Sequence, residues 1–573
     1  MKKIRIAGPP GTGKTRRLVK IFYDNIQKYS ATEIIMTSHT NTAADEIRDR
    51  ILDDANIQKY QDETGNDIFR KVKESKKTLE ETVTTIHTYC LSKIQKKEGE
   101  SVVFNIDDYN NLKLQHPGKF DAHTGSQEFY NLEMLIARHP FFKFHSTARD
   151  NGLETVPYYW TLSFAEKGEY KYTITELQEL EKDYNNFKNN IKLNLRAERL
   201  LDFQDMVEHF TNSDEVKSED LGIKILMVDE AQDSSVIQRA AEKKMAAAVE
   251  YFYKAGDPDQ SLFGFAGANP DDFHKEFANP EIELEQGYRC PRVINEYCKN
   301  IIRSLWVYYE YAGGGRVWSP RRELDKDGKP TGPIVEGELY EMMNLEQDPH
   351  LAELTKRLTE TNETVAFTYR GNEPKETIKY LIKLGVSFKI ADKHNRFKFK
   401  YPKADILNQR NFLKLIREKE KITAASVKRM LKNTLPEYLG KNYSEENLDE
   451  IDKGNYDIEW LIKNQFLEPI VKQSDDFQNI CKIKKISYIS TIEMKNFIRS
   501  IVKHDPSGDL GKNPRIVLEN IHTIKGKEFD NSVVDLTILR EEDEKAKKRM
   551  KYVACSRARK TLWIIKSRNG MTL

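Results

Sequence analysis

The 573-residue sequence predicts an α/β protein in which helices flank parallel sheets. Two observations predict this class. Short apolar strands alternate with polar loops and helices over residues 4–51, and the pattern resumes at residues 223–255. A second set of such units starts at residue 365. In open sheets of this kind, ligands bind at the carboxyl ends of the strands, so loops that follow strands are the first candidates for a site.

The composition restricts the class of protein further. Hydrophobic residues make up 38% and charged residues 32%, and 92 Lys and Arg against 90 Asp and Glu leave a formal charge of +2. Bulk charge therefore neither requires nor excludes a polyanionic partner. No apolar run approaches ~18 residues, so we expect no membrane span. The five cysteines lack C-x-x-C spacing, which favours reduced thiols in an intracellular protein.

The first strand leads into a glycine-rich loop. Residues 1–7 read MKKIRIA, residues 8–15 read GPPGTGKT, and an amphipathic helix should follow. This is the spacing of a phosphate-binding loop, in which backbone N–H groups surround an anion, Lys14 reaches the β- and γ-phosphates and Thr15 offers its hydroxyl to Mg²⁺. The predicted nucleotide-binding residues here are Gly8, Pro9, Pro10, Gly11, Thr12, Gly13, Lys14, Thr15 and Arg16.

Two further strands end in polar loops. Residues 33–37 lead to His39, Thr40 and Asn41, and residues 82–86 lead to His87. Because the carboxyl ends of parallel strands share one edge, we expect these side chains on the same rim as Lys14. Three such loops on one rim indicate a shared ligand surface.

An acidic pair follows the strand at residues 223–228. Asp229 and Glu230 begin the segment DEAQD. In a protein with a phosphate loop, an apolar strand that ends in Asp-Glu predicts that Asp229 holds Mg²⁺, directly or through water. Glu230 would orient and deprotonate the attacking water.

Two long stretches lack phosphate-type motifs and are expected to be mostly helical insertions. Residues 97–197 include a long charged helix from about residue 175. Residues 389–432 carry 14 Lys and Arg against 4 Asp and Glu, with interleaved aromatic residues. Such a stretch can neutralise phosphates and stack bases, and a solvated pair of basic helices explains it equally well.

The remaining motifs are distinctive in sequence and order. They are TNTAA at 40–44, DEAQD at 229–233, GDPDQSLFGFAGA at 256–268, QGYR at 286–289, HTIKGKEF at 522–529 and YVACSRA at 552–558. This series resembles the UvrD/Rep-like branch of superfamily 1 DNA helicases over nearly the whole chain.

The resemblance implies two RecA-like P-loop NTPase lobes, each with a mostly helical inserted subdomain. The first lobe would comprise residues 1–96 and 198–290, with residues 97–197 inserted. The second would comprise residues 291–390 and 512–573, with residues 391–511 inserted.

It also implies how the ATP site is completed. Gln260 would sense the γ-phosphate, Tyr288 would stack on the adenine and Glu528 would contact the ribose. Arg289 and Arg557 would reach the γ-phosphate from the side of the second lobe, like arginine fingers. Together with Lys14 and Glu230, the residues Gln260, Arg289 and Arg557 form the predicted catalytic set.

A second set of positions matches those that line the single-strand groove of the family. Stacking on aromatic rings would tolerate any base. The implied nucleic-acid-binding residues are His39, Thr40, Asn41, Thr85, His87, Phe265, Tyr369, Arg370, Asn372 and His522.

The implied activity is ATP-dependent and Mg²⁺-dependent translocation on single-stranded DNA with duplex unwinding, in the 3′ to 5′ direction. The implied partners are single-stranded DNA, single-strand/duplex junctions and proteins of a repair, replication or defence assembly, in the cytoplasm of a bacterium or of a cell that a virus infects. Only residues 536–550 occupy the place of the family's strand-separating hairpin, and only seven residues precede Gly8, where the family has an adenine-reading glutamine motif.

Three alternatives therefore stay open. The first is a motor that moves or displaces proteins without unwinding, the second is an RNA track, and the third is a nucleotide-gated binding module that hydrolyses little ATP.

Overall fold

The chain forms two compact units. They are Met1–Glu336 with Glu541–Ser556, and Gly337–Arg540 with Arg557–Leu573. The computed structural model describes residues 1–98, 101–120, 135–136, 139–162, 167, 172–194, 199–264, 267–275, 281–306, 317–326, 328–369, 374–391, 402–449, 451, 453–474, 476–482, 488–504, 515–536 and 544–566. The four-part division predicted from the sequence is finer than these two units and stays a prediction.

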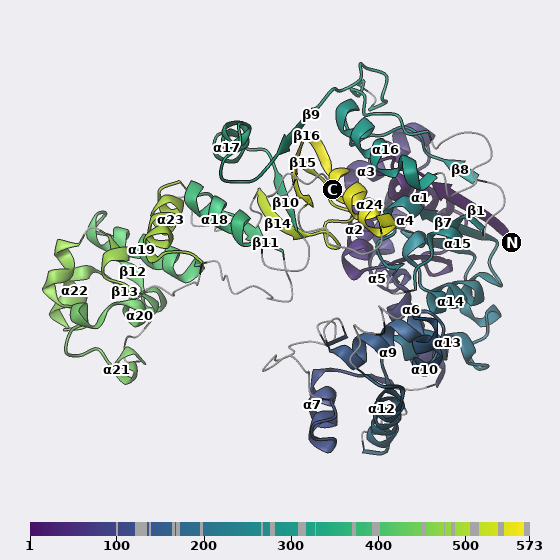
Figure 1. The fold of residues 1–573 in the computed structure, drawn as a ribbon, viewed down its shortest axis with the longest axis horizontal. Helices are drawn as coiled ribbons and strands as arrows, with labels where there is room; N and C mark the ends of the chain where they lie inside the picture. Colours follow the sequence, from purple (N-terminus) through teal and green to yellow (C-terminus); the bar gives the residue numbers. More distant parts are fainter. Residues whose placement is uncertain are drawn as a thin grey trace. The chain divides into compact units, whose positions relative to one another are not determined.

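A six-stranded parallel sheet organises the first unit (Figure 1). Its strand order is β3-β2-β6-β7-β1-β8. The strands are β1 (Lys2–Ala7), β2 (Ile34–Ser38), β3 (Val83–Thr85), β6 (Ile225–Val228), β7 (Tyr251–Gly256) and β8 (Glu281–Glu283). In the register, Ala7 pairs with Gly256 and Ser38 pairs with Thr85, so the carboxyl ends of these strands lie along one rim.

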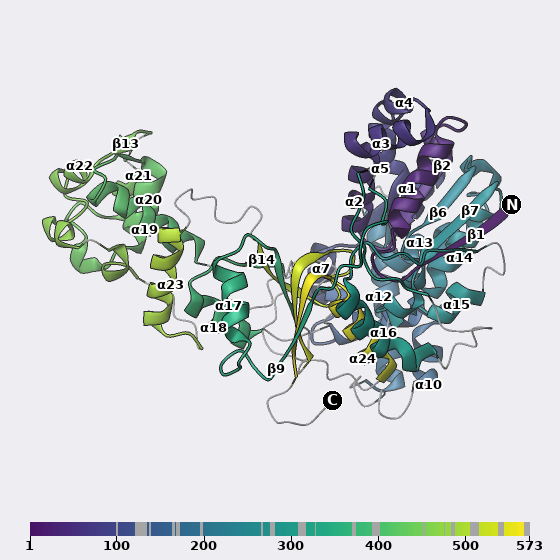
Figure 2. The same ribbon diagram turned by 90° about the horizontal axis from the view of Figure 1, so that it is seen from above.

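Both faces of this sheet are covered by helices, as Figure 2 shows for α1 and α13. The period of two along β6 explains why: Ile225 and Met227 face one core, whereas Leu226 and Val228 face the other. The first core is closed by α1 (Lys14–Asn25), α2 (Asn41–Leu52), α3 (Asp54–Thr64), α4 (Phe69–Glu74) and α5 (Lys76–Thr82). The second is closed by α6 (Ile86–Glu98), α13 (Phe203–Asn212) and α14 (Val236–Ala246).

The insertion in the first unit has an aromatic core of its own. Phe104, Phe141 and Phe142 pack there around Tyr184, with all three rings edge to face with the tyrosine ring and ring centroids 5.1–6.1 Å apart. Its elements are β4 (Ser101–Val103), α7 (Ile106–Gln115), α9 (Pro140–Asp150), α10 (Thr155–Thr161), α12 (Ile174–Asn194) and β5 (Arg199–Leu201). The short strands β4 and β5 pair in parallel at the base of this insertion.

The second unit holds another six-stranded parallel sheet, in the order β11-β14-β10-β15-β16-β9. Its strands are β9 (Glu338–Met342), β10 (Val365–Tyr369), β11 (Lys389–Ile390), β14 (Ile516–Asn520), β15 (Phe529–Asp535) and β16 (Ala558–Ile565). The helices α17 (Leu351–Thr359), α18 (Lys375–Leu384) and α23 (Thr491–His504) share a core with this sheet.

The insertion in the second unit is mostly helical. It comprises α19 (Lys403–Ile416), β12 (Ile422–Thr423), α20 (Ala424–Asn433), α21 (Glu445–Asp449), β13 (Asn455–Tyr456) and α22 (Ile458–Lys463) around one apolar cluster. Two parallel sheets flanked by helices confirm the predicted α/β class. Across the described part of the chain, no helix has the length and apolar character needed to cross a bilayer. All five cysteines are buried and none forms a disulfide.

Candidate nucleotide and nucleic-acid site

The loop between β1 and α1 has the curled backbone that a phosphate-binding loop requires. Gly11 and Gly13 have φ values of 70° and 87°, which favour glycine. A side chain on Gly11 would place its Cβ 2.5 Å from the Cβ of Arg289, so the loop packs closely against that residue. The hydroxyl of Thr12 donates to the carbonyl of Pro9 at 2.8 Å and holds the curve closed.

Lys14, the first residue of α1, turns back into this loop. Its Nζ donates to the carbonyl of Gly8 at 2.8 Å and to that of Pro9 at 3.3 Å, and only 8% of the residue is exposed. The N-terminus of α1 and a buried ammonium group therefore share one small volume. Both favour an anion there, which is what a nucleotide's phosphates would supply.

Thr15 and Asp229 meet across the sheet rim although 214 residues separate them in the chain. The Oγ1 of Thr15 donates to Oδ2 of Asp229 at 2.7 Å. Burial and the neighbouring Glu230 raise the pKa of Asp229 to about 6, although the hydrogen bond from Thr15 and the charge of Lys14 oppose this. A hydroxyl and a buried carboxylate side by side are oxygen ligands of the kind that Mg²⁺ prefers.

Glu230 occupies a left-handed backbone conformation with φ of 55°, which is costly for a residue other than glycine. Its Oε2 accepts a hydrogen bond from Nε2 of Gln232 at 2.6 Å. The amide oxygen of Gln232 accepts from the backbone N–H of Asp257 at 2.9 Å. Gln232 thus fixes the carboxylate of Glu230 and ties the end of β6 to the end of β7.

Gln260 ends the short 3₁₀ helix η4 (Pro258–Gln260), which directly follows β7. Its Nε2 donates to Oδ2 of Asp257 at 2.6 Å, and both residues are buried. The backbone N–H of Leu262 donates to Oδ1 of Asp233 at 3.3 Å. The segment around Gln260 is therefore attached to the same acidic turn that carries Glu230.

Tyr288 and Arg289 lie against the phosphate loop within the first unit. The backbone N–H of Tyr288 donates to the carbonyl of Gly11 at 2.8 Å, and 39% of Tyr288 is exposed. Nη1 of Arg289 donates to the carbonyl of Ser556 at 3.5 Å, the residue that precedes Arg557 in the chain. The partly exposed Tyr288 and the side chain of Arg289 therefore border the loop at Gly11.

The other two residues expected at the nucleotide belong to the second unit. The carbonyl of Arg557 accepts from the N–H of Phe529 at 3.0 Å, at the start of the β15–β16 pairing. Glu528 lies beside it and receives a 3.3 Å hydrogen bond from Nη1 of Arg559. The structure thus brings Glu528 and Arg557 together on adjacent strand ends, and their roles toward a nucleotide stay predictions.

Five of the predicted nucleic-acid residues lie on the rim of the first sheet. His39, Thr40 and Asn41 follow β2, whereas Thr85 ends β3 and His87 is the second residue of α6. The ring of His39 packs on Phe263 with centroids 4.5 Å apart. The ring of His87 packs on that of Phe203, with ring centroids 5.7 Å apart. Burial, and then the nearby His39, lowers the pKa of His87 to about 4, so this imidazole is neutral at pH 7.

Two more of the predicted nucleic-acid-binding residues, Tyr369 and His522, lie on the rim of the second sheet. Tyr369 ends β10, which pairs with β14 so that Tyr369 is opposite Asn520. His522 follows two residues later, and its N–H donates to Oδ1 of Asn520 at 3.0 Å. Tyr369 and His522 therefore share one strand-end edge. The predicted residues Phe265, Arg370 and Asn372 lie outside the described residues.

Sequence reasoning gave no role to Gln232 or Asp257, although both lie inside recognised motifs. Their function in the site is to orient Glu230 and Gln260 through side-chain hydrogen bonds. The only signal in the sequence was their position between residues with assigned roles. Two amides and two carboxylates in short motifs after adjacent strands could have been interpreted as one network.

Comparison with known proteins identifies this arrangement. Residues 1–279 match the UvrD/REP helicase N-terminal domain. In this part of the chain, the protein is similar to the N-terminal domain of UvrD/REP helicases. The ATP-dependent DNA helicase Rep of Buchnera aphidicola from Schizaphis graminum is 25% identical over 313 residues, 52% of this chain and 42% of that protein.

The homology extends beyond this domain at low identity. Rep of Buchnera aphidicola from Acyrthosiphon pisum is 23% identical over 516 residues, 86% of this chain and 70% of that protein. DNA helicase II of Haemophilus influenzae is 32% identical over 112 residues, 18% of this chain and 15% of that protein. The chain is thus a distant homologue of the superfamily 1 enzymes Rep and DNA helicase II, and it spans between a seventh and about two thirds of their lengths.

Proposed function

We propose that the protein is an ATP-driven motor that moves 3′ to 5′ along single-stranded DNA and unwinds duplexes at single-strand/duplex junctions. The observation that carries the ATP site is the 2.7 Å hydrogen bond between Thr15 and Asp229 beside the buried Lys14. It joins a phosphate loop to an acidic strand end, which is the minimal arrangement for nucleotide hydrolysis.

Each residue at the first rim has a distinct task in this proposal. Lys14 and the N–H groups of the loop bind the phosphates, and Thr15 and Asp229 hold Mg²⁺. When bound, Mg²⁺ would neutralise charge that develops on the phosphate oxygens. Glu230, held by Gln232, orients and deprotonates the attacking water. Gln260 lies in the same hydrogen-bonded network and senses the γ-phosphate.

Arginine side chains complete the hydrolytic site. Arg289 borders the phosphate loop and donates a hydrogen bond to the carbonyl of Ser556. Arg557 is the next residue in the chain after Ser556. Positive charge directed at the γ-phosphate stabilises the transition state of phosphoryl transfer, and removing such a group lowers the rate by about 10³-fold or more. Tyr288, whose ring is partly exposed, would stack on the base, and Glu528 would contact the ribose.

A single strand would pass over the strand-end rims. The first rim offers His39, Thr40, Asn41, Thr85 and His87, and the second offers Tyr369 and His522. Aromatic rings and uncharged polar groups accept any base sequence. If ATP binding and hydrolysis alternately tighten and loosen the grip of two rims, the strand moves in one direction.

The test is strand separation by the full chain on duplexes with a 3′ or a 5′ single-stranded tail, with ATP or GTP and Mg²⁺. We expect release of the shorter strand from the 3′-tailed duplex with ATP. Release from the 5′-tailed duplex alone would contradict the polarity. Absence of ATP hydrolysis with any single strand would contradict the motor itself.

One observation favours a second candidate, a motor that displaces proteins or serves a larger assembly without unwinding alone. Only residues 536–550 occupy the place where the family carries its strand-separating hairpin. Streptavidin displacement from a biotinylated single strand, without strand release from a forked duplex, would support this candidate over the first.

A further inference from the structure

Helix α9 packs into the first insertion and also contacts two helices that flank the first sheet. Phe141 and Phe144, near its start, lie in the aromatic core of the first insertion. Its other end contacts α13 and α14. Those helices bury Val207 and Ile237 in the core under the first sheet. α9 is therefore a rigid connection between the insertion and the sheet that carries the nucleotide rim.

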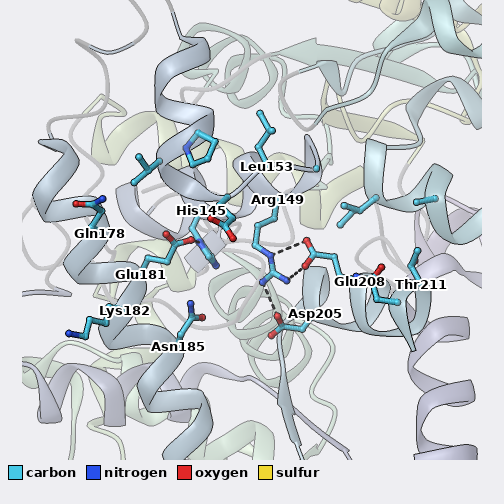
Figure 3. A pocket seen from close by; sticks show the side chains of 17 residues that line it. His145, Arg149, Leu153, Gln178, Glu181, Lys182, Asn185, Asp205, Glu208 and Thr211 are labelled. Carbon is cyan, nitrogen blue, oxygen red and sulfur yellow. Dashed lines mark hydrogen bonds and ion pairs between the residues drawn. The ribbon is translucent and has the colours of Figure 1, made fainter. Parts of the chain in front are cut away.

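Arg149, in the last turn of α9, pairs with three carboxylates at α13, of which Figure 3 shows Asp205 and Glu208. Nε and Nη2 donate to the two oxygens of Glu208 at 3.1 and 2.5 Å. Nη1 donates to Asp205 at 2.8 Å and to Asp202 at 3.5 Å. Burial alone would lower the pKa of Arg149, but the carboxylates outweigh burial and raise it above its usual range. Such a bidentate pair is geometrically specific.

The space beside this ion-pair cluster is not filled by apolar packing. A cavity of about 960 Å³ separates the insertion from α13 and α14. Charged and amide groups from α12 and α13 line it, including Glu181, Lys182 and Asn185 (Figure 3). At this junction, the ion pairs of Arg149 supply directional contacts between α9 and α13.

The turn held by Arg149 contacts the loop that follows Gln260. Gly267 has φ of 74°, and a Cβ there would lie 2.5 Å from the carbonyl oxygen of Asp150. The loop is closed by hydrogen bonds from Gly267 N–H to the carbonyl of Gly264 and from Ala268 N–H to that of Phe263, both 3.2 Å. Only glycine fits here, since both the backbone conformation and the close approach exclude a side chain.

The same turn contacts the segment that follows Glu230. A Cβ on Gly152 would lie 3.0 Å from Cγ1 of Val236, the first residue of α14. Val236 follows the acidic motif within three positions. The end of α9 therefore lies against both chain segments that carry the proposed water-activating and γ-phosphate-sensing residues, through the backbone at Gly267 and through the side chain of Val236.

We propose that Arg149 is a positioning residue that holds the end of α9 against the loop at Gly267, so that the first insertion fixes the position of Gln260 for hydrolysis. This inference rests on the proposed function. A shift of the loop by about 1 Å would misplace Gln260 relative to a γ-phosphate without removing any group that binds nucleotide.

The experiment compares Arg149→Met with Arg357→Met in the full chain. Arg357 pairs with Glu353, Glu338 and Glu363 in the second unit, so it controls for the loss of a guanidinium from a cluster of three carboxylates. Two quantities are measured. They are kcat and KM for ATP with saturating oligo-dT, and hydrogen exchange of the peptide covering residues 260–268 without nucleotide.

We expect Arg149→Met to lower kcat roughly tenfold, to leave KM for ATP within about twofold and to accelerate exchange of the 260–268 peptide. Arg357→Met should change neither quantity. An Arg149→Met protein with kcat within about twofold of the wild type and unchanged exchange would overturn the inference. Wild-type protein without ATP hydrolysis would instead overturn the proposed function, and the exchange comparison would still decide the positioning role.

A second pair of variants keeps the test valid if the loss of the guanidinium group unfolds the Arg149→Met protein, in which Lys188 still pairs with Asp202 and Asp205. Gly267→Ala introduces the clash with Asp150, whereas Gly65→Ala places alanine at φ of 72° with no atom within 4 Å. We expect the kcat loss and the faster exchange for Gly267→Ala only. Arg149→Lys should retain part of the rate, because lysine keeps the charge and loses the bidentate geometry. Equal effects of both glycine variants would overturn the inference.

Discussion

The two parallel sheets have the same number of strands and different chemistry on their rims. In the first sheet, β1 is followed by a loop with two left-handed glycines and by Lys14, and β6 is followed by Asp229 and Glu230. In the second sheet, β10 is followed by α18 without a glycine-lysine motif, and its rim presents Tyr369 and His522. The comparison teaches that the architecture supplies a rim, whereas a few side chains decide whether that rim binds phosphate.

The largest expected effect comes from removing the ammonium group of the first rim. Lys14→Ala should lower ATP turnover by about 10³-fold or more, since a buried cation that faces the phosphates is lost, and should leave single-strand binding largely intact. A coupled assay measures the ATP turnover, and fluorescence anisotropy with labelled oligo-dT measures the single-strand binding. Lys20→Ala, an exposed position on the same helix paired with Glu63, is the control. Equal loss of ATP turnover and of single-strand binding in Lys14→Ala would contradict the assignment of separate sites for nucleotide and single strand.

Ion pairs beneath the two sheets should also differ in strength. Lys254 and Glu242 pair at 2.8 Å in the first unit with 2% of each side chain exposed, whereas Lys560 and Glu363 in the second have 48% and 17% exposed. Lys254→Met leaves a buried carboxylate unpaired and should cost about 3–5 kcal/mol, whereas Lys560→Met should cost at most about 1 kcal/mol. Urea unfolding followed by hydrogen exchange in each unit measures both.

The contrast is sharpened by the double variant Lys254→Met/Glu242→Gln. It removes both charges and should recover part of the stability lost in Lys254→Met, because the cost arises from the unpaired carboxylate. Equal losses in Lys254→Met and Lys560→Met would show that the two pairs do not differ.

A smaller effect is expected at the second rim. His522→Ala should weaken single-strand affinity by roughly tenfold through lost stacking, with unchanged KM for ATP. His350→Ala, at the start of α17 in the same unit, should have no effect on affinity. Anisotropy titrations at fixed salt provide the measurement. A raised KM for ATP in His522→Ala would contradict the assignment of this rim to the strand.

An effect of similar size concerns pH. The pKa of His87 is lowered to about 4 from an ordinary value of 6.5, so between these values the unfolded chain binds the proton more strongly. Stability should therefore fall as the pH drops from 6.5 toward 4, by about 1–2 kcal/mol from this residue. His87→Gln should flatten that dependence in urea midpoints at pH 5 and 7. An identical slope in the variant would contradict the buried neutral state.

The local parts of this structure could be predicted from the sequence. The phosphate loop is contiguous, and the amphipathic helix expected after it is present as α1. Edge strands such as β8 (Glu281–Glu283) were missed because three residues with two charges give no alternating signal. The contact of Gly267 with Asp150 could not be foreseen, since it joins positions 117 apart through backbone atoms.

The central claim, a motor whose nucleotide site responds to a single strand, is tested most directly by ATP hydrolysis. The wild-type full chain is assayed with ATP and Mg²⁺, with and without saturating oligo-dT, beside Lys14→Ala. The account predicts a rate at least roughly tenfold higher with the oligonucleotide, and no such rate in Lys14→Ala. Equal rates with and without the oligonucleotide would contradict it.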